Sequence, residues 1–221
     1  MKTSKFSGVV FDLWNTLVPL PNHLKEQAFR ETSATLGYDD NEFQSPWAVT
    51  RTKRETGDLL EYLYWLRNEL SAEWSNETIN AAMEVRKTIH GSAFLNPDRE
   101  AIEVLRTLKM NGYKVGLISN CSSDVRDMIT TSELGQYIDT LVLSSELGIM
   151  KPDERIFKLA ASKLGVSCSE CLYIGDGHDN ELEGAENVGM EAVLIDRGDG
   201  RKWDKKVVNS LSSILKEVGL A

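Results

Sequence analysis

The chain has 221 residues, enough for one α/β domain with a smaller insert. Its formal net charge of −9, with no concentrated basic patch, argues against a nucleic-acid partner. No apolar run approaches the length of a membrane span, so we expect a cytoplasmic protein without a membrane partner, as a monomer or homodimer.

The first strand-like segment is Gly8–Phe11, a continuous apolar run typical of a strand buried on both faces. The long interval after it contains no such run. It predicts helices over Leu24–Leu36, Leu59–Leu70 and Glu77–Ile89, with Pro46 and Gly57 as interruptions. An all-helical block after the first strand predicts a separate cap. We expect an all-helical cap domain at residues 20–92 and a core domain formed by residues 1–19 and 93–221.

Strands and helices alternate in the rest of the chain. Strand-like runs at Lys114–Ile118, Thr140–Leu143, Cys171–Ile174 and Ala192–Ile195 are accompanied by helical patterns at Arg99–Met110, Glu154–Leu164 and Glu181–Val188. Repetition of strand, helix and strand favours a parallel sheet with right-handed crossovers. The predicted fold class is therefore α/β, a doubly wound, Rossmann-like parallel sheet with an inserted all-helical cap.

Polar residues follow four of these predicted strands. They are the segment from Asp12 to Thr16, the pair Ser119 and Asn120, the segment from Ser144 to Lys151, and the segment from Gly175 to Glu181. Ligands bind beyond the carboxyl ends of strands in an open parallel sheet. Any single Ser, Asn or Asp here is explained by helix capping. Complementary carboxylate, hydroxyl and ammonium groups at all four strand ends instead predict a catalytic site.

The four segments resemble, in order and across nearly the whole chain, the four motifs of haloacid dehalogenase-like hydrolases. Asp12 to Thr16 matches the nucleophile motif, and Ser119 matches the hydroxyl of the second motif. Lys151, followed by Pro152, matches the lysine of the third motif. Asp176, with Glu181 five residues later, matches the acidic fourth motif. The helical insert matches the family's cap between the first and second motifs.

The resemblance implies a hydrolase that forms an aspartyl-enzyme intermediate on Asp12, and most of all a phosphatase of a small phosphorylated metabolite. It implies a Mg²⁺ cofactor held by Asp12, Asp176 and the backbone carbonyl of Trp14, with Glu181 acting through a water molecule. The negative net charge does not exclude a small anionic substrate, because the local potential of a cleft matters more than the total charge.

The resemblance also assigns the groups that bind the substrate. Lys151 would neutralise the nucleophile and the transferring group, as a second catalytic residue. Ser119, with the backbone N–H groups near Leu13 and Asn120, would hold the phosphoryl oxygens. Arg51 in the insert is a further candidate for an anionic substrate, although a solvated basic face is the favoured explanation of this residue.

Trp14 departs from the family pattern. Most family phosphatases carry a second Asp at this position, which protonates the leaving group, whereas an indole only donates a hydrogen bond. A general acid contributes about 10²–10⁴ in rate, so poor leaving groups should react slowly. Trp14 would instead narrow the substrate site. A phosphohydrolase then needs a good leaving group or another acid, for which His178 is a candidate.

Two alternatives stay open. The family's carbon–halogen hydrolases resemble this chain in having an aromatic residue at the position of Trp14, and a halide leaves without protonation. Those enzymes lack the metal site, whereas Asp176 is retained here and would repel Asp12 unless a cation lay between them. The non-enzyme alternative is a weakly active binding or regulatory module. Complete loss of activity is disfavoured by the intact set of Asp12, Ser119, Lys151 and Asp176.

Overall fold

A six-stranded parallel sheet in the order β3-β2-β1-β4-β5-β6 forms the centre of the structure, a computed structural model that describes residues 4–95, 97–198 and 200–220. The strands are β1 (Gly8–Phe11), β2 (Lys114–Ser119), β3 (Thr140–Leu143), β4 (Cys171–Gly175), β5 (Glu191–Ile195) and β6 (Lys206–Val208). The order places β1 in the middle, with the chain crossing to either side of it. This confirms the predicted doubly wound α/β fold class.

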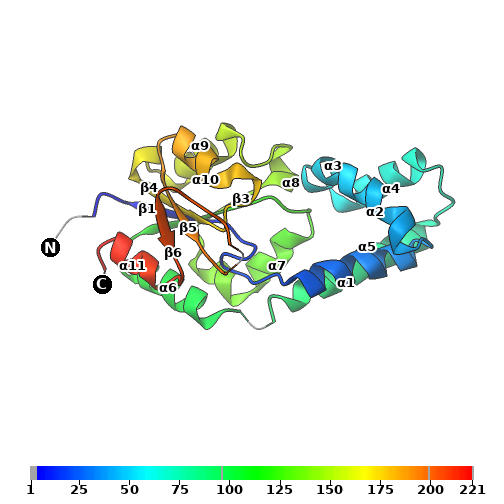
Figure 1. Cartoon of the computed structure of the whole chain (residues 1–221), viewed down its shortest axis with the longest axis horizontal. Helices are drawn as coiled ribbons and strands as arrows, with labels where there is room; N and C mark the ends of the chain where they lie inside the picture. The colour runs from blue at the N-terminus through cyan, green and yellow to red at the C-terminus, as the bar shows by residue number, and fades with distance from the viewer. Residues whose placement is uncertain (1–3, 96, 199, 221) are drawn as a thin grey trace.

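Helices cover both faces of the sheet (Figure 1). One face packs against α6 (Arg99–Met110), α7 (Val125–Thr131) and α11 (Ser213–Glu217), and the other against α9 (Glu154–Leu164) and α10 (Glu181–Asn187). Alternate residues of β1 serve the two layers, because Val9 and Phe11 belong to one hydrophobic cluster and Val10 to the other. This two-sided burial explains why the strands read as continuous apolar runs.

Short helical segments fill several connections. They are α8 (Ser144–Leu147) and the 3₁₀ turns η1 (Glu133–Tyr137), η2 (Cys168–Glu170) and η3 (His178–Asn180). Segment α8 directly follows β3, and η3 closely follows β4. Both therefore lie at the carboxyl ends of strands, where ligands bind in such sheets.

The described residues between β1 and α6 form an all-helical insert. Its helices are α1 (Asn22–Thr35), α2 (Asp40–Val49), α3 (Arg51–Glu55), α4 (Leu59–Glu69) and α5 (Asn76–Ser92). Helices α1 and α5 lie side by side and connect the insert to the core (Figure 1). The insert has a hydrophobic cluster of its own, which includes Phe43, Leu63 and Trp74. The domain boundaries at residues 20 and 92 stay a prediction.

Pro46 lies inside α2, where the sequence had suggested an interruption. A proline removes one backbone N–H donor from a helix and usually breaks it. Here the Asp39 carboxylate caps the helix by accepting hydrogen bonds from the N–H groups of Asn41 and Glu42. Phe43 and Trp47, four residues apart, are buried in the insert, and this packing outweighs the lost hydrogen bond.

Both chain ends lie at the end of the core away from the insert (Figure 1). The insert therefore lies at the opposite end of the sheet, where the candidate catalytic residues are. Within the described residues, no helix combines the length and apolarity needed to cross a membrane.

Candidate active site

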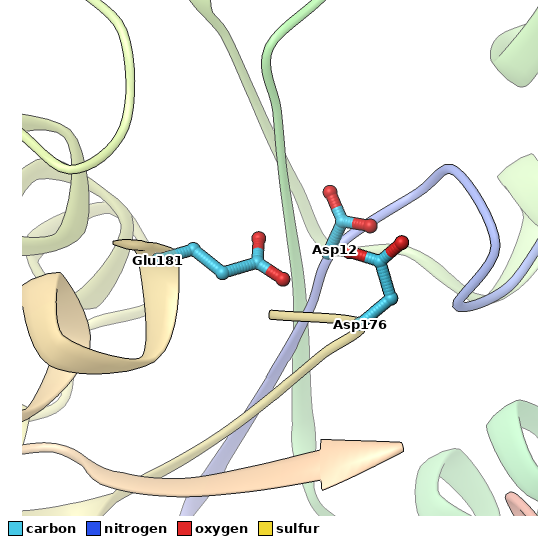
Figure 2. A group of neighbouring side chains, drawn as sticks. All are labelled: Asp12, Asp176 and Glu181. Carbon is cyan, nitrogen blue, oxygen red and sulfur yellow. The ribbon is translucent and has the colours of Figure 1, made fainter. Parts of the chain in front are cut away.

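Three carboxylates converge at the carboxyl ends of β1 and β4 (Figure 2). Asp12 follows β1, Asp176 follows β4, and Glu181 is the first residue of α10. Because β1 and β4 pair in parallel, with Phe11 opposite Ile174, Asp12 lies opposite Gly175 and Asp176 follows at the same edge of the sheet. Each of the three side chains offers an oxygen within 4.8 Å of the others, and all three are buried.

Lys151 joins this cluster from the loop after β3. Its Nζ donates hydrogen bonds to Asp12 Oδ1 at 2.6 Å and to the Tyr173 hydroxyl at 3.2 Å, and it also contacts Glu181 Oε2. Burial alone would lower the pKa of Lys151, but the charges of Asp12 and Glu181 outweigh it and raise the pKa above its usual range. The buried ammonium therefore stays charged beside the candidate nucleophile.

Glu181 is held from both of its carboxylate oxygens. Oε2 accepts from the Tyr173 hydroxyl at 2.8 Å, and Oε1 accepts from the Gly177 N–H at 3.0 Å. Burial raises the pKa of Glu181 to about 7. A side chain at position 175 would collide with this carboxylate, which explains the glycine at the end of β4.

The donor set fits a hard divalent cation. Burial raises the pKa of Asp12, Lys151 opposes that rise, and Asp176 adds to it. Asp176 is oriented by the His178 N–H at 3.0 Å and by Asn15 Nδ2 at 3.3 Å. Three carboxylates face one ammonium, so a cation would restore the charge balance, and carboxylate oxygens are the ligands that Mg²⁺ prefers. The Trp14 carbonyl accepts no backbone hydrogen bond from the residues in view.

The other predicted phosphoryl contacts differ in their surroundings. Ser119, at the end of β2, is fully buried and its Oγ has no hydrogen-bond partner in the described chain. Asn120 Oδ1 accepts from the Lys151 N–H at 2.8 Å, and Asn120 Nδ2 donates to Lys151 O at 3.2 Å and to Asp179 Oδ2 at 2.8 Å. The Leu13 side chain is fully buried in the core, so only its backbone is available to a ligand.

Arg51 connects the insert to the catalytic loops. Its two terminal nitrogens bind the two oxygens of Asp179 at 2.8 and 2.7 Å, a bidentate pair from α3 to η3. Burial would raise the pKa of Asp179, but its hydrogen bonds to Arg51 and Asn120 outweigh that effect and lower the pKa to about 2. Arg51 thus serves a carboxylate of the protein itself, in addition to bordering the cavity.

His178 stands at the rim of the site. Its side chain is 55% exposed, and its Nε2 lies 3.7 Å from Asp176 Oδ2. Three non-glycine residues of these loops have left-handed backbone conformations: Asn15 (φ 60°), Asp179 (φ 57°) and Asn180 (φ 50°). Such conformations are strained for residues other than glycine and concentrate at functional sites.

A cavity of about 310 Å³ lies between the core and the insert. Its core end is lined by Asp12, Asn120, Lys151, Asp176 and Glu181, and its insert end by Lys25, Phe29, Trp47, Arg86 and His90. The ring of Trp14 borders the cavity and contacts His90 and Phe94, with ring centres 5.9 and 5.6 Å apart. Ser119 is fully buried and is not among these lining residues.

Sequence reasoning missed Lys25, Arg86 and His90. They lie on helices of the insert, where a helical pattern says nothing about which polar residue faces another domain. It also missed the hydrogen bond from Asn15 to Asp176. The position of Asn15 inside the first motif, among polar residues at a strand end, is a signal that could have indicated it.

Comparison with known proteins identifies the family. Residues 6–189 match haloacid dehalogenase-like hydrolases. The chain is 31% identical over 207 residues to a ribulose-1,5-bisphosphate 5-phosphatase of Halopiger xanaduensis, covering 86% of this chain and 84% of that protein. It is 32% identical over 168 residues to phosphatase MT3486 of Mycobacterium tuberculosis, covering 75% and 74% of the two proteins.

A solved structure shares the fold over almost its whole length. The HAD phosphatase of Thermococcus onnurineus superposes with a TM-score of 0.70 and 22% identity, covering 97% of this chain and 98% of that one. Together with the matched family residues and the ordered strand-end motifs, these similarities show that the chain belongs to the haloacid dehalogenase-like hydrolase family.

Proposed function

We propose that the protein is a Mg²⁺-dependent phosphatase of small phosphorylated metabolites that acts through an aspartyl-phosphate on Asp12. The buried arrangement of Asp12 between Lys151 and Asp176 carries this proposal. The names of two similar proteins, a ribulose-1,5-bisphosphate 5-phosphatase and a phosphatase of M. tuberculosis, agree with it.

The chemistry proceeds in two displacements on phosphorus. An Asp12 carboxylate oxygen forms a bond to phosphorus, and the bond from phosphorus to the leaving oxygen breaks. Water then attacks the same phosphorus, the bond to Asp12 breaks, and phosphate departs. Lys151 holds Asp12 through its Oδ1 and balances the charge of the transferring group, and Ser119 with the backbone of Leu13 and Asn120 binds phosphoryl oxygens.

Asp12, Asp176 and the Trp14 carbonyl are the proposed Mg²⁺ ligands. When bound, Mg²⁺ supplies the positive charge that lets a carboxylate approach a phosphoryl group. Because hydrogen bonds engage both oxygens of Glu181, we assign it to the outer shell, where it fixes Lys151 and acts through a water molecule.

Trp14 determines which leaving groups suit this site. Among the acids that border the cavity, Asp179 is held ionised by Arg51, and His90 has a pKa lowered to about 2 by burial. Both carboxylate oxygens of Glu181 are engaged by Tyr173 and Gly177. We therefore assign none of the three as the proton donor. We therefore propose substrates whose leaving group departs without protonation, such as acyl or aryl phosphates and phosphoanhydrides. For poorer leaving groups, the proposed donor is His178.

The aromatic residue at position 14 also favours a second candidate, hydrolysis of a carbon–halogen bond, because a halide needs no proton. The contact of Asp12 with Asp176 weighs against it. Without a cation, the second carboxylate repels the nucleophile, and burial already raises the pKa of Asp12.

One assay panel tests these functions. The purified chain is incubated with an aryl phosphate and with 2-chloropropionate, each with Mg²⁺ and with EDTA. We expect Mg²⁺-dependent phosphate release that falls about a thousandfold or more in Asp12→Asn. The control Asp127→Asn alters an exposed carboxylate on α7 and should keep wild-type activity. Chloride release that persists in EDTA would establish the dehalogenase. Equal, negligible turnover of both compounds by wild type and Asp12→Asn would establish a binding module.

A further inference from the structure

Two cations of the insert face the cavity opposite the catalytic carboxylates. Lys25 comes from the first turn of α1, and Arg86 comes from the second half of α5. These are the ends of the α1 and α5 pair that lead into the core, as Figure 1 shows. The cavity therefore has an acidic end around Asp12 and a basic end around Arg86.

Neither cation makes a direct contact with a carboxylate of the described residues. Within the described ranges, the side chains of Lys25 and Arg86 make no hydrogen bond and no ion pair, and the Nε atom of Arg86 is buried without an acceptor. A charged group that is removed from water without a partner is costly. Perturbed ionisable groups that face a cleft are candidates for a functional site.

The surroundings of Arg86 provide aromatic contacts and attraction from two carboxylates, but no hydrogen bond. Its guanidinium lies over the Trp47 ring, 5.4 Å from the ring centre, and Arg54 lies 4.0 Å from the centre of the same ring. Asp124 and Glu55 are the nearby carboxylates that attract Arg86. Glu55, however, is already bound by Arg51 at 3.1 Å, and Asp124 does not line the cavity.

Helix α1 adds to the positive potential of this end. It begins at Asn22 without a side-chain cap and has no acidic residue in its first turn, so its N-terminal partial charge is not offset locally. His90 next to the two cations is buried, and its lowered pKa, due first to burial and then to Arg86, Arg54 and Lys25, keeps it neutral. The basic end thus depends on Arg86 and Lys25.

We propose that Arg86 and Lys25 bind a second anionic group of the substrate, a carboxylate or a phosphate, while the phosphoryl group to be cleaved lies at Asp12. This assignment rests on the proposed phosphatase function and narrows its substrates to small phosphorylated compounds with a second negative charge. The cavity of about 310 Å³ sets the size, because it is near the lower limit for ligand pockets. Trp14 and Phe29 also line this cavity.

Matched esters test the proposal by kinetics. Glycerol 3-phosphate, 3-phosphoglycerate and glycerol 1,3-bisphosphate share a primary leaving oxygen and a central hydroxyl and differ in the distal group: neutral, carboxylate or phosphate. With Mg²⁺, we expect kcat/KM for one of the two doubly anionic esters to exceed that for glycerol 3-phosphate by about tenfold or more. The ester that is preferred identifies the second group as carboxylate or phosphate.

Variants assign the preference to the basic end. In Arg86→Met the ratio of kcat/KM for the doubly anionic ester to kcat/KM for glycerol 3-phosphate should approach one. Lys25→Met should reduce the ratio in the same direction, and Arg86→Lys should retain part of it. The matched control is Lys87→Met, the next residue of α5, which does not line the cavity and should keep the ratio. An unchanged ratio in folded Arg86→Met would overturn the proposal.

Binding to Asp12→Asn separates this proposal from the function on which it rests. Calorimetric titration with the same three esters in Mg²⁺ requires no turnover. We expect the doubly anionic ester to bind about tenfold or more tightly than glycerol 3-phosphate, and Asp12→Asn with Arg86→Met to lose that difference. Equal affinities for the three esters in Asp12→Asn would refute the basic subsite. Tight selective binding with no wild-type turnover would refute only the phosphatase.

Discussion

Trp14 is the residue that distinguishes this site most clearly. Its position follows the nucleophile by two residues, and its ring packs between His90 and Phe94 at the border of the cavity. The side chain therefore supplies an apolar wall where a carboxylate would supply a proton. An indole cannot accept or release a proton at neutral pH, so we expect Trp14 to change the range of leaving groups and not the nucleophile.

Restoring the acid tests this account. Trp14→Asp should raise the turnover of an alkyl phosphate by about tenfold or more, because protonation of the leaving oxygen becomes available. The lost ring contacts should lower the free energy of unfolding by about 3 kcal/mol. Steady-state kinetics on alkyl and aryl phosphates, with urea unfolding, measure both effects. Trp14→Phe keeps most of the packing and no acid, so a similar gain in that variant would contradict the explanation.

His90 predicts a pH dependence of stability. Burial, followed by the charges of Arg86, Arg54 and Lys25, lowers its pKa from 6.5 to about 2. Below pH 6.5 the unfolded chain binds a proton that the folded chain does not, so stability falls as the pH falls. The contribution approaches about 1.4 kcal/mol per pH unit.

The measurement compares His90→Asn with wild type. We expect the free energy of unfolding, measured with urea at several pH values below 6.5, to fall less steeply with falling pH in the variant. The difference in slope should correspond to about one proton fewer taken up on unfolding. His23→Asn on α1 is the control, since His23 is exposed and lies outside the cavity lining. Parallel curves for wild type and His90→Asn would show that His90 takes up its proton in the folded state.

At the scale of elements, α3 fastens the insert over the catalytic loops. Besides the pair of Arg51 and Asp179, the Ser144 hydroxyl donates to the Glu55 carbonyl at 2.5 Å. At the start of α4, the Leu59 N–H donates to the Ser123 hydroxyl at 2.9 Å. These contacts lie on the side of the insert away from the α1 and α5 connections, so they govern how firmly the cavity is closed.

Loss of the bidentate pair should weaken closure. Arg51→Met and Asp179→Asn should each lower kcat/KM about tenfold, because the cap no longer holds the substrate in a closed site. If the residues act as a pair, the double variant should lose no more than either single variant. Kinetics on an aryl phosphate complete this cycle. The control is Arg126→Met, which breaks an exposed ion pair with Glu146 on the surface of the α/β core domain. Additive losses would show that the two residues act independently.

At the scale of the whole molecule, a protein of net charge −9 contains a cavity with ends of opposite sign. The catalytic end concentrates Asp12, Asp176 and Glu181 around one lysine, and burial raises the pKa of both Asp12 and Glu181. Folding thus brings together carboxylates that repel each other. A divalent cation should relieve this repulsion and stabilise the folded chain.

Mg²⁺ at about 100 times its dissociation constant should stabilise the protein by about 2.7 kcal/mol. For a chain of this length, that corresponds to a rise of about 5–10 °C in Tm relative to EDTA. Differential scanning calorimetry measures the shift, which Asp176→Asn should largely abolish and Asp127→Asn should keep. An equal Mg²⁺ shift in Asp176→Asn would place the cation elsewhere.

The sequence by itself predicted the layers of the core, five of the six strands and the order of the strand-end motifs. Strands buried on both faces must be apolar throughout, so Gly8–Phe11 and its partners stand out from any neighbouring segment. Strand β6 was not predicted from the sequence, because only Val208 of its three residues is buried. Helix α2 was missed because Pro46 suggests a break that local packing of Phe43 and Trp47 overrides.

Only the tertiary structure decided which cap residues face Asp12. Lys25 and Arg86 are separated by sixty residues of insert, and their meeting depends on how α1 and α5 pack and on the angle at which both return to the core. The same holds for Arg51, whose partner Asp179 is a core residue. The sequence is enough to predict that motifs at strand ends lie together, because parallel pairing brings the carboxyl ends of the strands to the same edge of the sheet. A cap contact has no such register, because it arises from packing between two separate layers of side chains.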